Sequence, residues 1–281
     1  MHLELDFTNK HVFVFGGTTG INFGIASAFA RNGAKVTVAS RKQENVDAAC
    51  TQLAEHGGAA FGVVADVRDF DAVGSAFSAA VERFGPIDVL VSGAAGNFLC
   101  EAKDMSSNGF RTVVDIDLVG TFHVMRQAYS YLRKPGSAVI NVTAPQSAIP
   151  MRYQAHCGAA KAGVDQLTRI LALEWGVEGI RINAVSPGPI DGTEGFNRLM
   201  ARTDEERAVS LDAVPLKRFG SVDDIANLAM FLASPYGAYI SGALIPCDGG
   251  GAIESVKPAL EHAGRAASAE RHAKGGAGTP A

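Results

Sequence analysis

The sequence predicts an α/β protein in which seven parallel strands form one doubly wound sheet with helices on both faces. Two observations support this fold class. Seven short apolar runs alternate with longer segments of helical periodicity, which is typical of strands joined by right-handed helical crossovers. The runs are rich in Val, Ile, Phe and Ala, as expected when both faces of a strand are buried.

The strands are assigned to the apolar runs because each spans only five or six residues. In chain order they are residues 11–15, 35–39, 61–65, 87–92, 138–142, 181–185 and 243–247. The helices are assigned to the intervening segments because these are longer and have apolar residues on one side. They are residues 24–32, 44–56, 71–84, 109–131, 160–175 and 223–233.

We expect one domain over residues 1–260. At 281 residues with 47% hydrophobic side chains, the chain can build a large core, and α/β folds of about 200 to 250 residues commonly form a single unit. Residues 261–281 are mostly Ala, Gly, Glu, Arg and His, a composition that buries too little apolar surface to order the chain. We therefore expect a flexible tail there.

Composition also limits location and partners. No apolar run approaches the roughly 18 residues of a membrane span, and residues 1–10 lack the features of a secretion signal. The four cysteines are widely separated, with no CxxC pair and no zinc spacing. A net charge of -4 without a long basic stretch argues against nucleic acid. We expect a cytoplasmic protein with reduced thiols, no metal and no membrane contact.

A glycine-rich turn follows the first expected strand. Its residues are Gly16, Gly17, Thr18, Thr19, Gly20 and Ile21. Such a turn lets backbone N–H groups approach a pyrophosphate at the positive end of the next helix. A plain strand-to-helix turn is the alternative, but its position at the first strand-to-helix junction favours a dinucleotide. Asn22 replaces the third glycine of the dinucleotide-binding pattern, which bears on the packing of the first helix.

The end of the second expected strand favours NADP(H) over NAD(H). It reads Ser40, Arg41 and Lys42, with no acidic residue to bind an adenosine ribose. Arg and Ser there suit a 2′-phosphate, and a solvated basic loop is the alternative. Asp66 and Val67 follow the third strand, where the Asp66 carboxylate can accept from the adenine amine or cap the next helix.

With these motifs in order, the chain resembles the short-chain dehydrogenase/reductase family from about residue 7 to residue 250. The resemblance rests on the glycine-rich turn, Asp66, Lys161, Asn183 and Pro187-Gly188. It implies a Rossmann-like fold. Some segments are similar to the peroxisomal type of 2,4-dienoyl-CoA reductase within that family. These are residues 94–100, 115–122 and 187–195.

The catalytic positions of the family are altered in this chain. Lys161 stands where the family has its catalytic lysine, but Cys157 replaces the tyrosine four residues earlier and Ala144 replaces the serine. A thiol donates hydrogen bonds poorly, so ordinary carbonyl reduction is disfavoured. The dienoyl-CoA reductases also lack this tyrosine. In their conjugated reduction the oxygen needs only transient stabilisation, because carbon receives the proton.

The resemblance implies that NADPH transfers hydride to the δ carbon of a 2,4-dienoyl thioester and that the α carbon is protonated, which gives 3-enoyl-CoA. It assigns Lys161 to the nicotinamide ribose and the enolate, and Asp117 and Asp248 to proton transfer. The alternatives are a structural ion pair between Asp117 and Lys161 and a structural Asp-Gly-Gly turn at Asp248. Tyr153 and His156 are further candidates for the acid, with a pocket wall as the alternative.

The resemblance also assigns binding residues. Those expected around the nicotinamide are Pro187, Gly188, Pro189, Ile190 and Thr193. Those expected to contact the acyl-CoA substrate are Arg68, Phe98, Ser106, Ser107, Asn108 and Arg198. Residues 194–211 are expected to form a mobile lid over the site, with a solvated helix face as the alternative for their charges.

Two other functions remain open. The chain could act on another CoA thioester, with the same CoA contacts and a different acyl slot. It could also be a catalytically silent NADP-binding sensor, which the loss of the tyrosine and serine favours and the retained Lys161, Asp117 and Asp248 oppose. The resemblance further implies a homotetramer that uses the helices expected at residues 109–131 and 160–175.

Overall fold

Seven strands form one parallel sheet in the order β3-β2-β1-β4-β5-β6-β7. The structure is a computed structural model that describes residues 5–254. The strands are β1 (His11–Phe15), β2 (Lys35–Ser40), β3 (Ala60–Val64), β4 (Val89–Ser92), β5 (Ala138–Val142), β6 (Arg181–Pro187) and β7 (Leu244–Cys247). The predicted fold class is therefore confirmed. The strand order reverses between β1 and β4, the point at which open α/β sheets bind ligands, outside the carboxyl ends of their strands.

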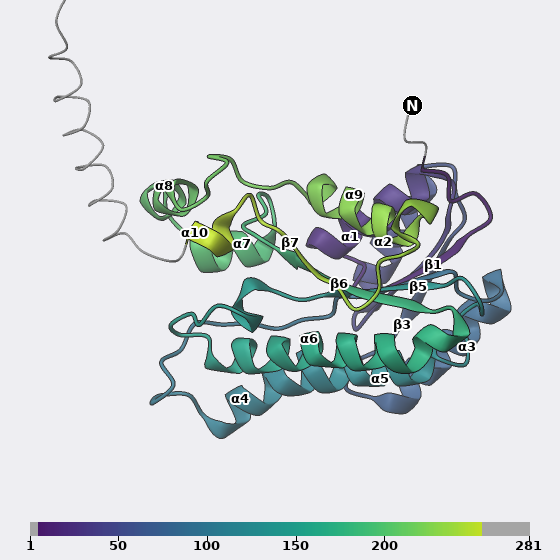
Figure 1. The fold of residues 1–281 in the computed structure, drawn as a ribbon, viewed down its shortest axis with the longest axis horizontal. Helices are drawn as coiled ribbons and strands as arrows, with labels where there is room; N and C mark the ends of the chain where they lie inside the picture. The colour runs from purple at the N-terminus through teal and green to yellow at the C-terminus, as the bar shows by residue number, and fades with distance from the viewer. Residues whose placement is uncertain (1–4, 255–281) are drawn as a thin grey trace, which may run out of the picture.

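Helices cover both faces of the sheet (Figure 1). One face carries α1 (Gly20–Arg31), α2 (Gln43–Ala54) and α9 (Val222–Ala233). The other carries α3 (Phe70–Phe84), α5 (Gly120–Ala128) and α6 (Ala155–Trp175), with α4 (Ser107–Val114) packed on α6. Three short helices gather near one end of the sheet (Figure 1), namely α7 (Glu194–Met200), α8 (Asp204–Asp212) and α10 (Gly251–Glu254).

Each face of the sheet has its own core, and β1 contributes to both. Val12 and Val14 pack with α1 and α9, whereas Phe13 and Phe15 point to the opposite face, where they stack on each other and pack at a tilt against Phe77 of α3. Successive strand side chains point to opposite faces. The unbroken apolar runs of the sequence therefore reflect burial on both sides of the sheet.

Three helices differ from their predicted limits by more than two residues. The helix predicted at residues 109–131 is interrupted by a π-helical turn at Asp115–Val119, between α4 and α5. The helices predicted to start at residues 24 and 160 begin earlier, at Gly20 and Ala155. Lys161 therefore lies in the second turn of α6 rather than at its start.

The predicted tail over residues 261–281 lies outside the described residues. Within residues 5–254, no helix combines the length and apolarity needed to cross a bilayer.

Candidate active site

The glycine-rich turn lies at the carboxyl end of β1, where the strand order reverses. Gly16 and Gly20 have positive φ angles of 73° and 57°, which glycine adopts without strain. A Cβ atom on Gly16 would come 3.0 Å from the backbone of Ala94, so this glycine allows the segment after β4 to approach. Thr19 precedes α1 and its side chain makes no capping hydrogen bond. The first N–H groups of α1 thus suit an anion such as a pyrophosphate.

Asn22 fastens this turn to the neighbouring strand. It lies in the first turn of α1, and its Nδ2 donates to the carbonyl oxygen of Gly93 at 2.7 Å. A Cβ atom on Gly93 would overlap the Asn22 side chain. The residue that replaces the third glycine therefore packs the start of α1 against the end of β4.

The expected adenosine end of the site is rich in positive charge. Ser40 ends β2, and Arg41 and Lys42 follow it as exposed residues. Beside them, the Arg68 guanidinium donates to both carboxylate oxygens of Asp66, with an Nη2–Oδ2 distance of 2.6 Å. These hydrogen bonds lower the pKa of Asp66, and the charge of Arg41 adds to the effect. Asp66 is therefore ionised and an acceptor at neutral pH.

Asp66 does not cap α3, which was one of the two roles considered for it. Asp69 caps that helix, because its Oδ1 accepts from two first-turn N–H groups at 3.1 and 3.0 Å. Asp66 instead holds Arg68, the arginine expected at a CoA phosphate. Between them, the Val67 side chain is buried and packs against Gly120, so it belongs to the core.

A buried ion pair joins Lys161 and Asp117, which are 4% and 0% exposed. Lys161 Nζ lies 3.3 Å from Asp117 Oδ2 and donates to the carbonyl oxygen of Val142 at 3.0 Å. Asp117 stands in the π-helical turn, and its Oδ1 accepts from Gly96 N at 2.7 Å. Such turns often mark functional sites. The ion pair considered as an alternative role for Asp117 is therefore present, at the carboxyl ends of β4 and β5.

Cys157 is buried beside this ion pair and cannot replace a tyrosine acid. Burial raises the pKa of the Cys157 thiol to about 11, and the Lys161 ammonium only partly offsets this effect. The thiol is therefore protonated at neutral pH and a weak donor. Since Ala144 has no functional group, the site lacks both hydroxyl groups of ordinary carbonyl reduction.

The other two candidate acids differ in exposure. Tyr153 is exposed and has a φ angle of 67°. His156 is fully buried, with its ring against Phe98. Neither side chain contacts Lys161 among the interactions of the described residues.

Residues 93–106, between β4 and α4, are tied to Gln154 just before α6 and to Arg198 of α7. Asn97 Nδ2 donates to Gln154 Oε1 at 2.7 Å, and Gln146 Nε2 donates to the same oxygen at 2.9 Å. Arg198 of α7 donates to the carbonyl oxygen of Asn97 at 3.0 Å, so the predicted lid contacts this segment. Its mobility stays a prediction.

The residues expected at the CoA moiety around the start of α4 form a helix N-terminus. Ser106 caps α4, with its hydroxyl oxygen accepting from Gly109 N at 3.0 Å. Ser107 and Asn108 form the first turn. This end of the helix presents N–H groups and a positive dipole. Contact with a substrate stays a prediction for these residues and for Arg68, Phe98 and Arg198.

Asp248 lies at the turn expected around the nicotinamide. Gly188 N donates to the carbonyl oxygen of Cys247 at 3.0 Å, and a Cβ atom on Gly188 would come 2.6 Å from Asp248 Cα. The Asp248 carboxylate accepts from Gly250 N and Ala252 N at 2.9 and 2.7 Å. The structural role considered for Asp248 is therefore present.

The remaining residues of the expected nicotinamide segment, Pro189, Ile190 and Thr193, lead directly into α7, which Thr193 caps.

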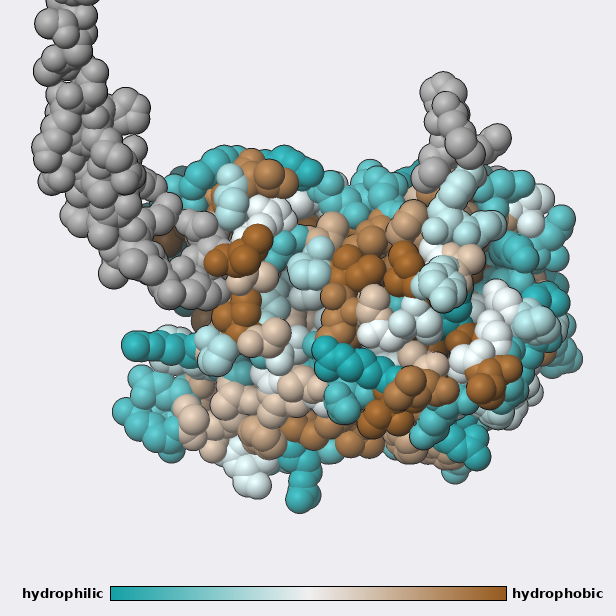
Figure 2. All heavy atoms as spheres, viewed as in Figure 1, coloured by the Kyte–Doolittle hydropathy of each residue, from teal (hydrophilic) through white to brown (hydrophobic). Residues whose placement is uncertain are grey.

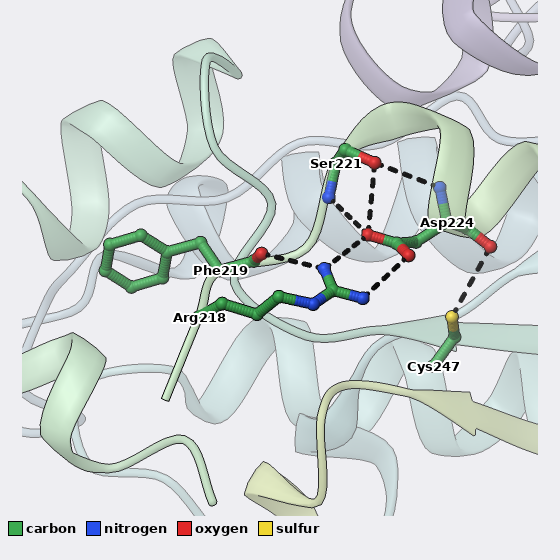
Figure 3. A network of polar contacts seen from close by, with 5 residues as sticks. All are labelled: Arg218, Phe219, Ser221, Asp224 and Cys247. Carbon is green, nitrogen blue, oxygen red and sulfur yellow. Dashed lines mark hydrogen bonds and ion pairs between the residues drawn. The ribbon is translucent and has the colours of Figure 1, made fainter. Parts of the chain in front are cut away.

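A cavity of about 430 Å³ lies next to Asp248, between the 187–193 segment and the start of α9. One wall is a polar network (Figure 3). The Asp224 carboxylate accepts from Arg218 Nη1 and Nη2 at 2.8 and 3.0 Å and from Ser221 N at 2.7 Å. These hydrogen bonds strongly lower the pKa of Asp224. On the other side of the α9 start, Cys247 Sγ donates to the carbonyl oxygen of Asp224 at 3.6 Å.

Sequence reasoning missed several residues that shape the site. Gln146 and Gln154 lie in an irregular connection, where no periodic pattern marks a partner. Arg218 and Asp224 form an ion pair at the end of the 194–220 segment. The only sequence signal for this pair is the capping-box spacing of Ser221 and Asp224, which predicts a helix start. In the described part of the chain, no three His, Cys, Asp or Glu side chains are grouped to hold a metal ion.

Comparisons with known proteins place this geometry in context. Residues 16–252 match the family model described as "Enoyl-(Acyl carrier protein) reductase". The peroxisomal 2,4-dienoyl-CoA reductase [(3E)-enoyl-CoA-producing] of Pongo abelii is 42% identical over 86% of this chain and 83% of its own length. A Bacillus subtilis protein named "Probable 2,4-dienoyl-CoA reductase [(2E)-enoyl-CoA-producing]" is 36% identical over 86% of this chain and 96% of its own length. A solved short chain dehydrogenase from Bacillus anthracis has a TM-score of 0.78 and 35% identity, with 86% and 96% coverage.

Proposed function

Because the chain belongs to the short-chain dehydrogenase/reductase family, we propose that it is an NADPH-dependent oxidoreductase that reduces 2,4-dienoyl-CoA thioesters to 3-enoyl-CoA. The observation that carries this proposal is the buried Lys161–Asp117 pair in a site without the tyrosine and serine hydroxyls. Such a site can stabilise an enolate, but it has no hydroxyl group at these positions to protonate a carbonyl oxygen. The identity to 2,4-dienoyl-CoA reductases supports the same substrate class.

The proposed reaction adds a hydride and a proton to the conjugated system. The reduced nicotinamide, when bound, supplies the hydride for the δ carbon. The π electrons then shift toward the thioester, and negative charge develops on its oxygen and α carbon. A proton at the α carbon leaves one double bond between the β and γ carbons. Because the oxygen carries no proton in the product, the site needs a stabilising charge there rather than a tyrosine acid.

The chain's own residues can supply that charge and handle the proton. The Lys161 ammonium is held by Val142 and Asp117 and adds positive potential where the enolate forms. Asp117 orients this ammonium, and we assign it a part in moving the proton. We assign Asp248 to the orientation of a water molecule that protonates the α carbon, while its carboxylate is fixed by Gly250 N and Ala252 N.

The preference for NADPH rests on the charge at the end of β2. Arg41 and Lys42 are exposed there, and no acidic residue stands among Ser40, Arg41 and Lys42. An arginine binds a 2′-phosphate through paired, charge-assisted hydrogen bonds. We expect Arg41→Ala to raise the KM for NADPH about tenfold, a loss of about 1.4 kcal/mol, and to leave the KM for NADH unchanged. An equal change for both cofactors in steady-state assays would contradict this assignment.

The position of the product double bond distinguishes the two types of named relative. The Pongo abelii enzyme is named as producing (3E)-enoyl-CoA and the Bacillus subtilis protein as producing (2E)-enoyl-CoA. The absence of a tyrosine acid beside Lys161 supports protonation at the α carbon, which gives the 3-enoyl product. We therefore propose the 3-enoyl product for this chain.

NADPH oxidation by the purified protein tests the function. The substrates are 2,4-decadienoyl-CoA, 2-decenoyl-CoA and a simple ketone. We expect turnover with the diene alone. Turnover with another CoA thioester and not with the diene would indicate a different acyl substrate. Tight NADPH binding without turnover of any thioester would indicate an NADP-binding sensor.

We also propose that the protein is a homotetramer, as its resemblance to the family implies. The α5 and α6 layer carries a shallow apolar groove of about 430 Å³, lined by Leu118, Val119, Phe122, Gly163, Gln166, Leu167 and Ile170. Apolar surface also runs along this layer in the space-filling view (Figure 2). Apolar patches on a protein surface often mark contacts with another chain.

For location, we propose the cytoplasm. The named relatives of eukaryotic origin include peroxisomal enzymes, whereas the Bacillus subtilis relative carries no such description. Fractionation of source cells with an antibody to the protein would decide between a soluble fraction and an enclosed organelle.

A further inference from the structure

His156 is a buried histidine without a role in the proposed chemistry. It is 0% exposed, and the backbone groups of Gln154 and Phe98 and the charge of Asp117 act on its ring. Burial lowers its pKa, so the ring is neutral at neutral pH. A buried polar ring in contact with Phe98, an expected substrate residue, calls for a functional explanation.

The His156 ring packs on Phe98. The ring centroids are 4.2 Å apart and the ring planes are inclined by 70°, which is a favourable edge-to-face arrangement. Phe98 is the exposed partner of the two, at 37%. The imidazole therefore takes a direct part in holding the Phe98 ring in place. The position of the Phe98 ring therefore depends on the size of the side chain at residue 156.

The backbone around Phe98 is fixed independently of this contact. Gly96 N donates to Asp117, and the Asn97 side chain donates to Gln154. Beyond Phe98, Cys100 N donates to the carbonyl oxygen of Tyr153 at 3.0 Å. Because the backbone is held on both sides, only the side-chain torsions of Phe98 can change the position of its ring.

Gly109 limits the ring from a second direction. A Cβ atom on Gly109 would come 3.1 Å from Ser106 Oγ and 3.2 Å from Phe98 Cζ, both closer than ordinary van der Waals contact. Gly109 belongs to α4 and His156 to α6, two helices that pack against each other (Figure 1). Added volume at residue 156 would push the Phe98 ring away from these helices, and added volume at residue 109 would displace the Phe98 ring together with the Ser106 hydroxyl.

We propose that His156 is a specificity-determining positioning residue that, with Gly109, sets the place of the Phe98 ring and so limits the acyl chain length the site accepts. This inference rests on the proposed function, because it takes Phe98 as a wall of the acyl slot. The five-membered imidazole keeps the slot at its native depth. A larger ring pushes Phe98 into the slot, and a smaller side chain lets Phe98 withdraw.

Steady-state kinetics with two chain lengths test the proposal. The values of kcat and KM are measured for 2,4-hexadienoyl-CoA and 2,4-decadienoyl-CoA with wild type, His156→Phe, His156→Ala and Gly109→Ala. His156→Phe and Gly109→Ala are expected to raise the KM of the longer substrate at least about tenfold relative to the shorter one, with kcat on the shorter substrate retained. His156→Ala is expected to weaken the discrimination between the two lengths.

A matched control lies at the other end of the same helix. Trp175 packs on Tyr129 with ring centroids 5.0 Å apart, so Trp175→Phe perturbs an aromatic contact of α6 far along the helix from residue 156. This variant is expected to leave the ratio of the two KM values unchanged. If His156→Phe does not fold, Gly109→Ala tests the same movement of Phe98 from the other side.

Equal effects on both chain lengths would overturn the proposal, whether they appear in KM or in kcat. Failure of the proposed function would look different, because the wild type itself would then reduce no diene. In that case the Kd values of hexanoyl-CoA and decanoyl-CoA, measured by calorimetry, take the place of KM. A shift of their ratio in His156→Phe and Gly109→Ala supports the proposal, and an unchanged ratio overturns it.

Discussion

At the scale of single residues, Lys161 and Asp117 stabilise each other's charge inside the protein. Asp117→Asn keeps an acceptor for Gly96 N but removes the negative charge. We expect it to lower kcat at least about 100-fold, the usual effect of losing one transition-state contact. Asp117→Ala leaves the Lys161 ammonium without its partner, and we expect it also to lower the free energy of unfolding by about 3–5 kcal/mol. Turnover assays and urea denaturation measure the two effects.

The two substitutions separate chemistry from structure. If Asp117→Asn retained turnover within tenfold of wild type while Asp117→Ala unfolded, Asp117 would be a structural ion-pair partner and no more.

Cys157 gives a prediction at alkaline pH. Its folded-state pKa of about 11 lies above the ordinary thiol value, so the folded state keeps this proton at a pH where the unfolded state has lost it. The resulting stability is complete below the ordinary thiol pKa and is lost as pH rises through the folded value. We expect the stability of wild type to fall by up to about 1.4 kcal/mol per pH unit more than that of Cys157→Ala over this window. Parallel denaturation curves would contradict this.

The family resemblance and its register located Lys161, and the apolar stretch around Asp117 marked that carboxylate, because a buried charge needs a partner. The partner of Arg198 was not predictable. Arg198 binds the carbonyl oxygen of Asn97, which lies 101 residues away in the chain. A backbone acceptor leaves no mark on the sequence.

At the scale of elements, Asp224 anchors the segment that leads from the predicted lid into α9. We expect Asp224→Ala to lower the free energy of unfolding by about 1–3 kcal/mol, because it removes a capping box and leaves Arg218 unpaired. The adjacent Asp223 pairs with Arg31 on the surface at 2.8 Å, and Asp223→Ala is expected to cost about 1 kcal/mol or less. Urea denaturation of both variants at neutral pH measures the difference.

The Asp224 effect has a definite pH dependence. Its folded-state pKa is depressed, so its stabilisation is present above the ordinary carboxyl pKa and is lost as pH falls below it. The gap in stability between wild type and Asp224→Ala should therefore shrink in acid. A stability difference between the two proteins that stays constant down to acid pH would show that the Asp224 charge does not stabilise the fold.

Strands were easier to predict than the starts of helices. Because both faces of the sheet are buried, each strand appears in the sequence as an apolar run, as β1 does. The starts of α1 and α6 carry no such mark, because Thr19 and Gln154 make no side-chain cap. The π-helical turn at Asp115–Val119 has the same apolar spacing as a helix, and therefore only the structure reveals it.

At the scale of the whole molecule, the α5 and α6 layer should hold subunits together. Ile170 lines the apolar groove and is exposed, so we expect Ile170→Lys to lower the molar mass in solution by placing a charge in the interface. Val209 of α8 is also exposed but lies outside the groove, and Val209→Lys is expected to leave the mass unchanged. Light scattering after gel filtration measures both. An unchanged mass for Ile170→Lys would assign the contact to another surface.

The architecture of residues 5–254 was predictable because alternating apolar runs and helical segments admit few topologies. The arrangement within the site was less so. The Asp248 carboxylate accepts from Gly250 N and Ala252 N, as in the structural turn that the sequence allowed. The partners of Asn97 and Arg198 were not predictable, because they depend on how distant segments meet.

The most direct test of the central claim is the position of the proton delivered during reduction. The protein is given NADPH and 2,4-decadienoyl-CoA in deuterated water, and the product is identified by NMR. We predict 3-decenoyl-CoA with deuterium at the α carbon and none at the δ carbon. A 2-decenoyl-CoA product with deuterium at the γ carbon would contradict the account. The γ carbon would then have received the proton in place of the α carbon that we propose.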